Sequence, residues 1–365
     1  MAPLGVHQPD ARSQPIDLPS PISSPTVSVI VLGYNGRRYL DDCLSSLLDQ
    51  EMAPDAYEIL YVDNASTDGS ADLVAERFPN VRILRLERNF GFAEGNNRGV
   101  TETRGRYIAV LNQDTVCHRR WLSELVATLE AHPDVKAVHS NILTPWCPGY
   151  AEKRRDGWPP IVHISELNRF GFVTYQQRPF SPEPIETLFL AGAASMVERE
   201  VIDRFGYLFD PDFVAYCEDT DLALRVRNLG YRSLLAPTSV VYHDLTPSTG
   251  LSWRTLRKTL MILRNRGLAY FKNMEPAEFL AFLPWLLIGA PLKPGELSLG
   301  TLRSALYGLA TVPLVPIALG WGVLHARKVG ARRSDVLRQR TLPRFALLRA
   351  LRRGVAGGPT ASRNA

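Results

Sequence analysis

The sequence predicts an α/β protein whose mostly parallel sheet is covered by helices on both faces. Short β-branched runs alternate with amphipathic stretches of about ten to fifteen residues, a pattern typical of βαβ units. Polar loops rich in Gly, Asn and Asp follow several of these runs, where such sheets bind ligands. With 365 residues, of which 45% are hydrophobic and 22% charged, the chain is long enough for a sizeable core.

The alternating pattern begins at Val27, after a proline-rich stretch with no apolar run and without the hydrophobic region of a signal peptide. We therefore expect residues 1–25 to be a disordered lead-in. From Val27 onward, predicted strands and helices alternate. The predicted strands cover residues 27–32, 58–62, 81–86, 107–111 and 135–139. The first predicted helix ends near Leu48, and the later ones cover 72–78, 93–103 and 121–132.

Residues 144–185 interrupt this alternation. Seven prolines lie there among aromatic residues such as Trp146, Trp158 and Tyr175, and no period is visible. A long insertion of this kind in a compact domain is typically functional or mobile. After it, the pattern predicts a strand over 187–197, a helix over 219–229 and a strand over 240–243, which resume the fold.

Charge is distributed unevenly along the chain. Residues 1–250 contain 23 Lys and Arg against 33 Asp and Glu, whereas residues 251–365 contain 19 against 4. An acidic body with a basic, apolar tail indicates attachment to an anionic surface. The arginines flank apolar stretches and do not alternate with stacking aromatics, which favours a membrane over nucleic acid. The four cysteines form neither a disulfide framework nor a Cys-x-x-Cys pair, so we expect a reducing compartment.

The tail combines basic and apolar segments. Residues 253–272 are basic and amphipathic, residues 279–292 are apolar but too short to cross a bilayer, and residues 304–324 carry no charge. Two prolines interrupt this last segment, which otherwise matches the roughly 20 residues of a spanning helix. Basic residues on both flanks favour the cytoplasm for both ends. A shallow hairpin or in-plane helices are therefore open beside a single crossing, as are two buried helices of a small subdomain.

The loops after the first two predicted strands face the same crevice at the carboxyl edge of the sheet. The first contains Tyr34 and Asn35, and the second contains Asp63, whose carboxylate can accept hydrogen bonds from a nucleobase imide or a ribose hydroxyl. The Gly-x-Gly-x-x-Gly motif and the Walker loop are absent after the first strand. Their absence argues against dinucleotide binding and phosphoryl transfer.

Two further loops reach the same edge. The third includes Asn89, Gly95 and Asn96, and its glycines allow the backbone to approach a ligand closely. The fourth contains Asn112 and Asp114. One carboxylate together with diphosphate oxygens is a common way to hold Mg²⁺ or Mn²⁺, although Asp114 taken alone would be interpreted as a helix N-cap.

In their order and spacing, these motifs resemble the family 2 glycosyltransferases of the GT-A fold, in the rhamnosyltransferase-like branch. The resemblance covers about residues 26–270 and implies that Asp63 contacts the base of a nucleotide sugar. It also implies that Asp114 is the metal-binding end of a degenerate Asp-x-Asp motif, with Asn112 where many relatives have the first Asp. The implied nucleotide-sugar residues are Tyr34, Asn35, Asp63, Asn89, Gly95, Asn96 and Asn112. The motifs that carry the resemblance are Val-Ile-Val-Leu-Gly-Tyr-Asn at 29–35, Val-Asp-Asn-Ala-Ser at 62–66, Asn-x-Gly-Phe-Ala-x-Gly-Asn-Asn-x-Gly at 89–99 and Leu-Asn-Gln-Asp-Thr at 111–115.

The second half adds residues that resemble the family's Glu-Asp motif. Glu218 and Asp219 open a predicted helix, whose N-terminus would keep carboxylates ionised. An inverting transfer needs one base for the proton of the acceptor hydroxyl. By resemblance we assign that role to Asp219 and acceptor positioning to Glu218, and the two roles could be exchanged. His243 is implied as a metal ligand or diphosphate contact, whereas Asp221 and Arg225, four apart on one helical face, are interpreted as structural.

The sequence thus predicts an inverting glycosyltransferase that uses Mg²⁺ or Mn²⁺ and a nucleotide diphosphate donor, with rhamnose or another hexose favoured. The expected acceptor is a hydroxyl of a lipid-linked or cell-envelope glycan at the cytoplasmic face of the membrane. The Gln-x-x-Arg-Trp signature of processive synthases is absent, so one sugar per encounter is expected. Two rivals are a polyprenyl-phosphate sugar synthase and a non-catalytic nucleotide-sugar binding protein. The expected parts are a lead-in (1–25), a nucleotide-sugar half (26–140) and an acceptor half (141–250) of one GT-A domain, membrane-associated helices (251–330) and a basic tail (331–365).

Overall fold

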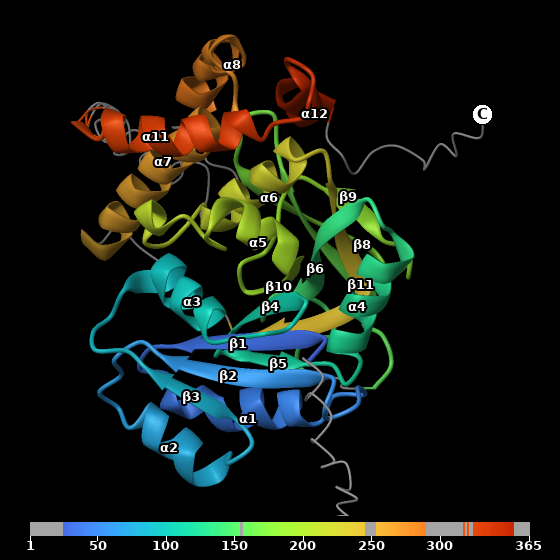
Figure 1. Cartoon of the computed structure of the whole chain (residues 1–365). Coiled ribbons are helices and arrows are strands. Elements are labelled where there is room, and N and C mark those ends of the chain that lie inside the picture. The colour runs from blue at the N-terminus through green and yellow to red at the C-terminus, as the bar shows by residue number, and fades with distance from the viewer. Residues whose placement is uncertain are drawn as a thin grey trace, which may run out of the picture.

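The computed structural model describes residues 25–153, 156–244, 253–289 and 324–353, together with the single positions 317 and 320. In Figure 1 the blue and teal N-terminal elements form the lower part of the molecule, and the orange and red C-terminal helices lie at the opposite end. Nearly all of the predicted lead-in and most of the charge-free segment 304–324 lie outside the described residues.

The central sheet has the strand order β3-β2-β1-β4-β10-β6-β11-β5, and β9 pairs with β11. Its first four strands run parallel, and β10 is inserted antiparallel between β4 and β6. The prediction of a mostly parallel α/β sheet is confirmed. The strands are β1 (Val27–Gly33), β2 (Tyr57–Asp63), β3 (Arg82–Arg85), β4 (Tyr107–Asn112), β5 (Thr115–Cys117), β6 (Val135–Leu143), β7 (Ile161–Leu167), β8 (Val173–Pro179), β9 (Ile185–Thr187), β10 (Ala194–Glu198) and β11 (Arg232–His243).

Helices cover both faces of this sheet because side chains of alternate strand positions are buried on opposite sides. Val29 and Val31 of β1 share one apolar core with α1, α2 and α4, whereas Ile30 shares the other with α3, α5 and α6. The helices are α1 (Arg37–Leu48), α2 (Ser70–Arg77), α3 (Gly91–Thr101), α4 (Trp121–Ala131), α5 (Arg199–Phe205), the 3₁₀-helix η1 (Pro211–Phe213), α6 (Glu218–Asn228), α7 (Trp253–Asn273), α8 (Pro276–Gly289), α11 (Ala326–Arg338) and α12 (Ala346–Arg353).

The prediction of one strand over 187–197 is wrong. The chain leaves the sheet between β9 and β10, because Leu188 and Phe189 are buried in a separate apolar cluster with the C-terminal helices. Gly192 in this connection approaches α6, where its backbone N–H donates to Asp219. The insertion 144–185 contains the β7–β8 hairpin, which forms its own two-stranded sheet.

The C-terminal helices pack on the sheet domain. α7 contacts α6, α8 and α11, and Leu347, Leu348 and Leu351 of α12 join the apolar cluster of Phe189. Two of the basic residues expected on a charged face of 253–272, Arg266 and Lys272, are in fact buried. Among the residues that the structure describes, no helix combines the length and the hydropathy required to cross a bilayer.

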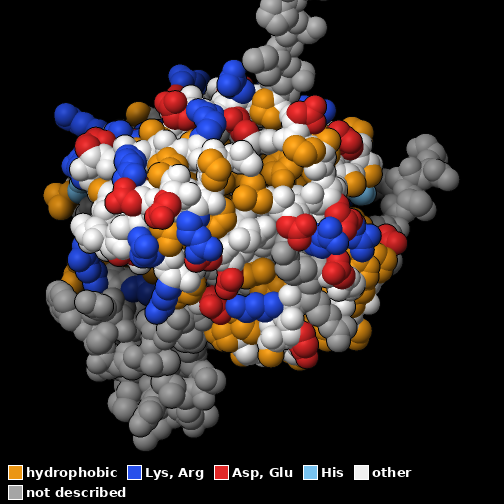
Figure 2. Space-filling model, turned by 90° about the horizontal axis from the view of Figure 1, so that it is seen from below, with side chains coloured by type: hydrophobic (Ala, Val, Ile, Leu, Met, Phe, Trp, Pro, Cys, Tyr) orange, Lys and Arg blue, Asp and Glu red, His pale blue; other side chains and the backbone are white. Residues whose placement is uncertain are grey.

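The face opposite the C-terminal helices has a mixed surface. Figure 2 shows acidic and basic side chains intermingled there, with apolar side chains between them. A nucleic-acid binding face would gather its Lys and Arg side chains into a patch or stripe. The visible part of this face has no such stripe.

Candidate active site

The loops after β1 and β2 are fastened to each other at the carboxyl edge of the sheet. Gly33 and Asp63, the last residues of these strands, are direct neighbours in the sheet. The Asn35 side chain accepts a hydrogen bond from the backbone N–H of Thr67 at 2.8 Å, and the backbone N–H of Asn35 donates to the Ser66 hydroxyl at 3.0 Å. Asp63 is 5% exposed, and Tyr34 beside it is 47% exposed. The loops thus place a carboxylate and an exposed aromatic ring at one edge of the sheet.

Asn64 organises the third loop. Its amide donates to the Asn89 side chain and to the Gly91 carbonyl, and its carbonyl oxygen accepts from the Phe90 backbone N–H. Asn96, by contrast, is buried and donates within its own helix to the Phe92 carbonyl. Asn89 thus contacts Asn64, the residue that follows Asp63, whereas the Asn96 side chain is hydrogen-bonded within α3.

Gly95 has a packing position in α3. A Cβ at this position would lie 2.7 Å from a methyl group of Leu32, so a larger residue would push α3 away from β1. The assignments of Gly95 and Asn96 to nucleotide-sugar binding remain predictions.

Asp114 and His243 lie together at the end of the sheet. β5 pairs antiparallel with β11, with Thr115 opposite His243, and this pairing brings the His243 Nε2 within 3.1 Å of the Asp114 Oδ1. The Asn112 side-chain amide is 3.4 Å from the same nitrogen. Burial alone would raise the pKa of Asp114, but the hydrogen bond and charge of His243 outweigh it and lower that pKa. Asp114 is therefore ionised at neutral pH, as a metal ligand must be.

This donor set fits Mg²⁺ or Mn²⁺ only in part. One carboxylate oxygen and one imidazole nitrogen converge, and within the described residues no group of three His, Cys, Asp or Glu side chains is arranged to hold a metal ion. Hard divalent ions commonly take one or two protein carboxylates and complete their shell with water and substrate phosphate oxygens. Asp114 and His243 can therefore hold such an ion when a diphosphate supplies further ligands.

The two carboxylates at the start of α6 differ in environment. Glu218 is buried, its Oε2 has no hydrogen-bond partner, and burial together with the charge of Asp219 raises its pKa well above the usual value. Burial raises the pKa of Asp219 to about 6, although the N–H groups of Thr220 and Gly192 stabilise the ionised form. Burial thus favours the protonated form of Glu218, whereas the two N–H groups stabilise the ionised form of Asp219.

A short backbone path joins Asn112, which lies beside Asp114 and His243, to the two carboxylates at the start of α6. The Asn112 N–H donates to the Ala193 carbonyl at 2.9 Å, and the adjacent Gly192 N–H donates to the Asp219 Oδ2 at 3.5 Å. A Cβ on Gly192 would stand 3.6 Å from the Cβ of Asp219. The structure thus brings Asn112, Asp114, His243 and Asp219 to one end of the sheet.

Sequence reasoning missed three residues that support this site. Asn64 belongs to a recognised motif, so its position after β2 could have indicated its role. Gly192 lay within the segment wrongly predicted as a strand. Asn265 of α7, which binds the loop before α6, lies in a stretch whose basic amphipathic pattern pointed to a membrane surface and not to the site.

Residues 28–206 match the family model described as glycosyl transferase family 2. The chain therefore belongs to glycosyl transferase family 2. This confirms the resemblance seen in the strand-end motifs, and the matched residues include the loops of Asp63 and Asp114 but end before α6.

Two individual relatives have low sequence identity to this chain. The N-acetylglucosaminyl-diphospho-decaprenol L-rhamnosyltransferase of Mycobacterium tuberculosis is 25% identical over 257 residues, which cover 61% of this chain and 77% of that protein. The uncharacterized protein y4gI of Sinorhizobium fredii is 27% identical over 237 residues, 62% of this chain. That match spans only 25% of the length of y4gI.

Among solved structures, the mannosyltransferase PcManGT from Pyrobaculum calidifontis, in complex with GDP-Man and Mn²⁺, is similar with a TM-score of 0.54 and 20% identity. The likeness covers 89% of each chain. At this identity it shows the GT-A type fold of the family 2 enzyme and no more.

Proposed function

We propose that this glycosyltransferase is an inverting, non-processive enzyme that moves one sugar from a nucleotide diphosphate donor to a hydroxyl of a lipid-linked or cell-envelope glycan. The observation that carries the proposal is the Asp219 carboxylate, which has a pKa of about 6 and lies at the same end of the sheet as the Asp114–His243 pair. A carboxylate of this pKa is ionised at neutral pH and still basic enough to accept a proton in the transition state.

Asp219 would act as the general base. As the acceptor hydroxyl attacks C1 of the donor sugar, its proton passes to a carboxylate oxygen of Asp219. The N–H groups of Gly192 and Thr220 hold that carboxylate in a fixed direction. Burial and the charge of Asp219 raise the pKa of Glu218 well above its usual value, which favours its protonated form and suits it to donate a hydrogen bond to the acceptor and not to accept the proton. This difference supports the assignment of Asp219 over Glu218 as the base.

Asp114 and His243 would hold Mg²⁺ or Mn²⁺ together with the donor diphosphate. When bound, such an ion neutralises the charge that develops on the leaving diphosphate. Asp63, Asn35 and Asn89 would orient the nucleotide on the other side of the crevice. The Mn²⁺ and GDP-Man in the PcManGT complex support this view of the donor side.

The name of the Mycobacterium tuberculosis relative supports a lipid-linked acceptor and rhamnose as the sugar. The two alternative functions are a polyprenyl-phosphate sugar synthase and a non-catalytic nucleotide-sugar binding protein. The test described below distinguishes both from the proposed function.

We further propose that the enzyme works at the cytoplasmic face of an anionic membrane and binds it through α8. Leu280 and Leu287 of this helix are 66% and 38% exposed, and the exposed Pro284 lies between them on the same face. In sequence, α8 leads into the apolar segment of the tail, and α12 beyond it presents exposed Arg352 and Arg353. Vesicles containing anionic lipid should bind the protein more strongly than neutral ones, and equal binding would contradict this attachment.

Asp219→Asn tests the proposed function. A panel of nucleotide diphosphate sugars is first screened for thermal stabilisation with Mn²⁺, and transfer of the best donor to a lipid-linked glycan is then measured. We expect the variant to bind donor like the wild type and to lose transfer by about a hundredfold to ten-thousandfold, the usual contribution of a general base.

Three other outcomes would contradict the proposal. If the variant transfers normally to a polyprenyl phosphate, the acceptor is a phosphate that needs no strong base. If the wild type binds donor but transfers to no acceptor and hydrolyses no donor, the protein is a binding protein. If Asp219→Asn abolishes donor binding, Asp219 is a binding residue and not the base.

A further inference from the structure

The four residues before α6, Val214–Cys217, form a segment that we call the left-handed loop. Val214, Tyr216 and Cys217 have φ angles of 53°, 68° and 66°, and none of them is glycine. Val214 has a ψ of −59°, and the Ala215 N–H donates across it to the Phe213 carbonyl, which makes the rare and strained form of the γ-turn. Each such residue is strained and persists only where its surroundings impose its conformation.

Asn265 of α7 makes the contacts that impose this conformation. Its side-chain Nδ2 lies 2.9 Å from the Phe213 carbonyl oxygen and 2.8 Å from each of the carbonyl oxygens of Ala215 and Tyr216. Asn265 itself is fully buried. An amide has only two N–H donors, so one of them is shared between two carbonyls. The turns of the loop thus point their carbonyls at one side chain.

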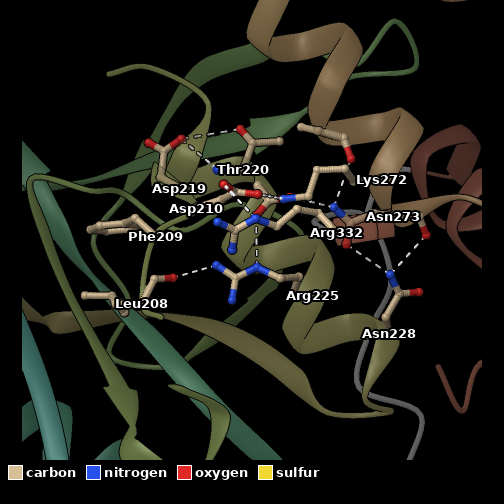
Figure 3. Close-up of polar contacts among 12 residues, drawn as sticks. Leu208, Phe209, Asp210, Asp219, Thr220, Arg225, Asn228, Lys272, Asn273 and Arg332 are labelled. Carbon is tan, nitrogen blue, oxygen red and sulfur yellow. Dashed lines mark hydrogen bonds and ion pairs between the residues drawn. The ribbon is translucent and has the colours of Figure 1, made fainter. Parts of the chain in front are cut away.

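A second contact fixes the ends of the same segment to α7. Lys272, two helical turns after Asn265, donates to Asp210 at the start of η1 and to Asp221 in the first turn of α6, at 3.0 Å in the second case. All three side chains are buried, and Arg332 of α11 lies 3.8 Å from Asp210. Figure 3 shows Lys272 and Arg332 beside Asp210, close to the start of α6 at Asp219 and Thr220. The segment between the two aspartates therefore has both ends anchored.

The opposite side of the left-handed loop contacts the start of α3, which follows the loop of Asn89. The Val214 carbonyl accepts hydrogen bonds from the N–H groups of Phe92 and Ala93, at 2.7 and 3.2 Å, where α3 begins. A Cβ on Gly91 would lie 2.8 Å from the same oxygen. The loop is thus held between α3 and α7, and any movement of it would displace the start of α6 and the Asp219 carboxylate.

We propose that Asn265 is a positioning residue for glycosyl transfer: it holds the left-handed loop in its strained conformation and so sets where the Asp219 carboxylate lies. Asn265 does not reach a substrate, because it is buried and its amide is occupied by backbone carbonyls. α7 thereby serves the active site from beyond the family-matched residues. The catalytic part of this proposal rests on the proposed function.

The test compares Asn265→Ala with Met274→Ala. Met274 is a matched control because it is a fully buried residue that directly follows the same helix, and it belongs to the apolar cluster of α8 and α12, away from the loop. We expect both variants to lower the melting temperature. Asn265→Ala should also lower kcat at least about tenfold with donor affinity unchanged, since an ångström of misplacement can cost about a hundredfold. Met274→Ala should keep kcat within about twofold, because the site geometry is intact.

Hydrogen exchange provides a readout that does not depend on activity. The Phe92 and Ala93 amides, which donate to the Val214 carbonyl, should exchange faster in Asn265→Ala and not in Met274→Ala. If Asn265→Ala does not fold, Asn265→Ser, which keeps one donor, is measured in its place and should show the same pattern to a smaller degree.

The proposal is overturned if Asn265→Ala keeps the wild-type kcat or if Met274→Ala lowers kcat by the same factor. It is also overturned if the Phe92 and Ala93 amides of Asn265→Ala exchange at the wild-type rate. A wild type without any transfer activity would instead refute the proposed function, and the exchange measurement would still decide whether Asn265 holds the loop.

Discussion

The donor half and the acceptor half of the proposed active site are built in different ways. Around Asp63 and Asn35, strand ends and short loops hold one another through hydrogen bonds within the first 100 residues. Around Asp219, the loop before α6 and its flanking aspartates are also held by α7 and α11, through Asn265, Lys272 and Arg332. The comparison teaches that the segment around Asp219, the proposed base, depends on residues far away in the sequence, whereas the loops around Asp63 are held by residues of the same first part of the chain.

The largest difference should appear in stability. Lys272→Met removes the buried cation that Asp210 and Asp221 share and leaves them only Arg332 and Arg225, so we expect it to lower the free energy of unfolding by about 3–5 kcal/mol. Arg77→Met in the donor half breaks only the exposed pair with Asp41 and should cost about 0–1 kcal/mol. Urea unfolding measures both, and equal losses would remove the contrast between the halves.

Asp114→Ala should separate metal-dependent from metal-independent donor binding. We expect donor affinity in Mn²⁺ to fall about tenfold to a hundredfold, since an interaction with a charged group is typically worth about 1.5–3 kcal/mol. The fold should be unaffected, because Asp114 lies in a turn between β4 and β5. Calorimetry with and without Mn²⁺ checks this expectation. A wild type that binds donor equally well in both conditions would argue against Asp114 as a metal ligand.

Asp63→Ala should have the smallest effect and should be independent of metal. The substitution removes the hydrogen bond from the Ser66 N–H as well as those to the nucleotide. We expect the affinities for free nucleoside diphosphate and for nucleotide sugar to fall by the same factor, about tenfold. Titration of both ligands measures this. A loss confined to the nucleotide sugar would place Asp63 against the sugar and not the base.

The part of the site around Asp63 and Asp114 could be predicted from the sequence better than the part around Asp219. The β1, β2 and β4 runs are apolar enough to mark their strands, and the carboxyl-edge rule then places Asp63 and Asp114 correctly. The family resemblance implied His243 as a metal ligand or diphosphate contact, and the structure places it 3.1 Å from Asp114 across a separation of 129 residues. These successes depend on local patterns.

The acceptor half offered no comparable local signal. Lys272 has the sequence neighbourhood of a surface residue, and its burial is decided by Asp210 and Asp221, which are 62 and 51 residues away. The residues between β9 and β10 read as a strand because Leu188, Phe189 and Leu190 are apolar, but tertiary packing draws them out of the sheet. Left-handed φ angles at Val214, Tyr216 and Cys217 are not typical of these residue types and cannot be read from them.

The pH dependence of kcat/KM tests the role of Asp219 most directly. The pKa of Asp219 is raised to about 6, and a general base must be ionised, so transfer should be low below that pH, rise through it and level off above it. Asp219→Asn should abolish this rise together with most of the activity. A wild-type profile that stays flat from pH 5 to pH 8, or a variant that keeps the rise, would contradict the assignment of Asp219 as the base.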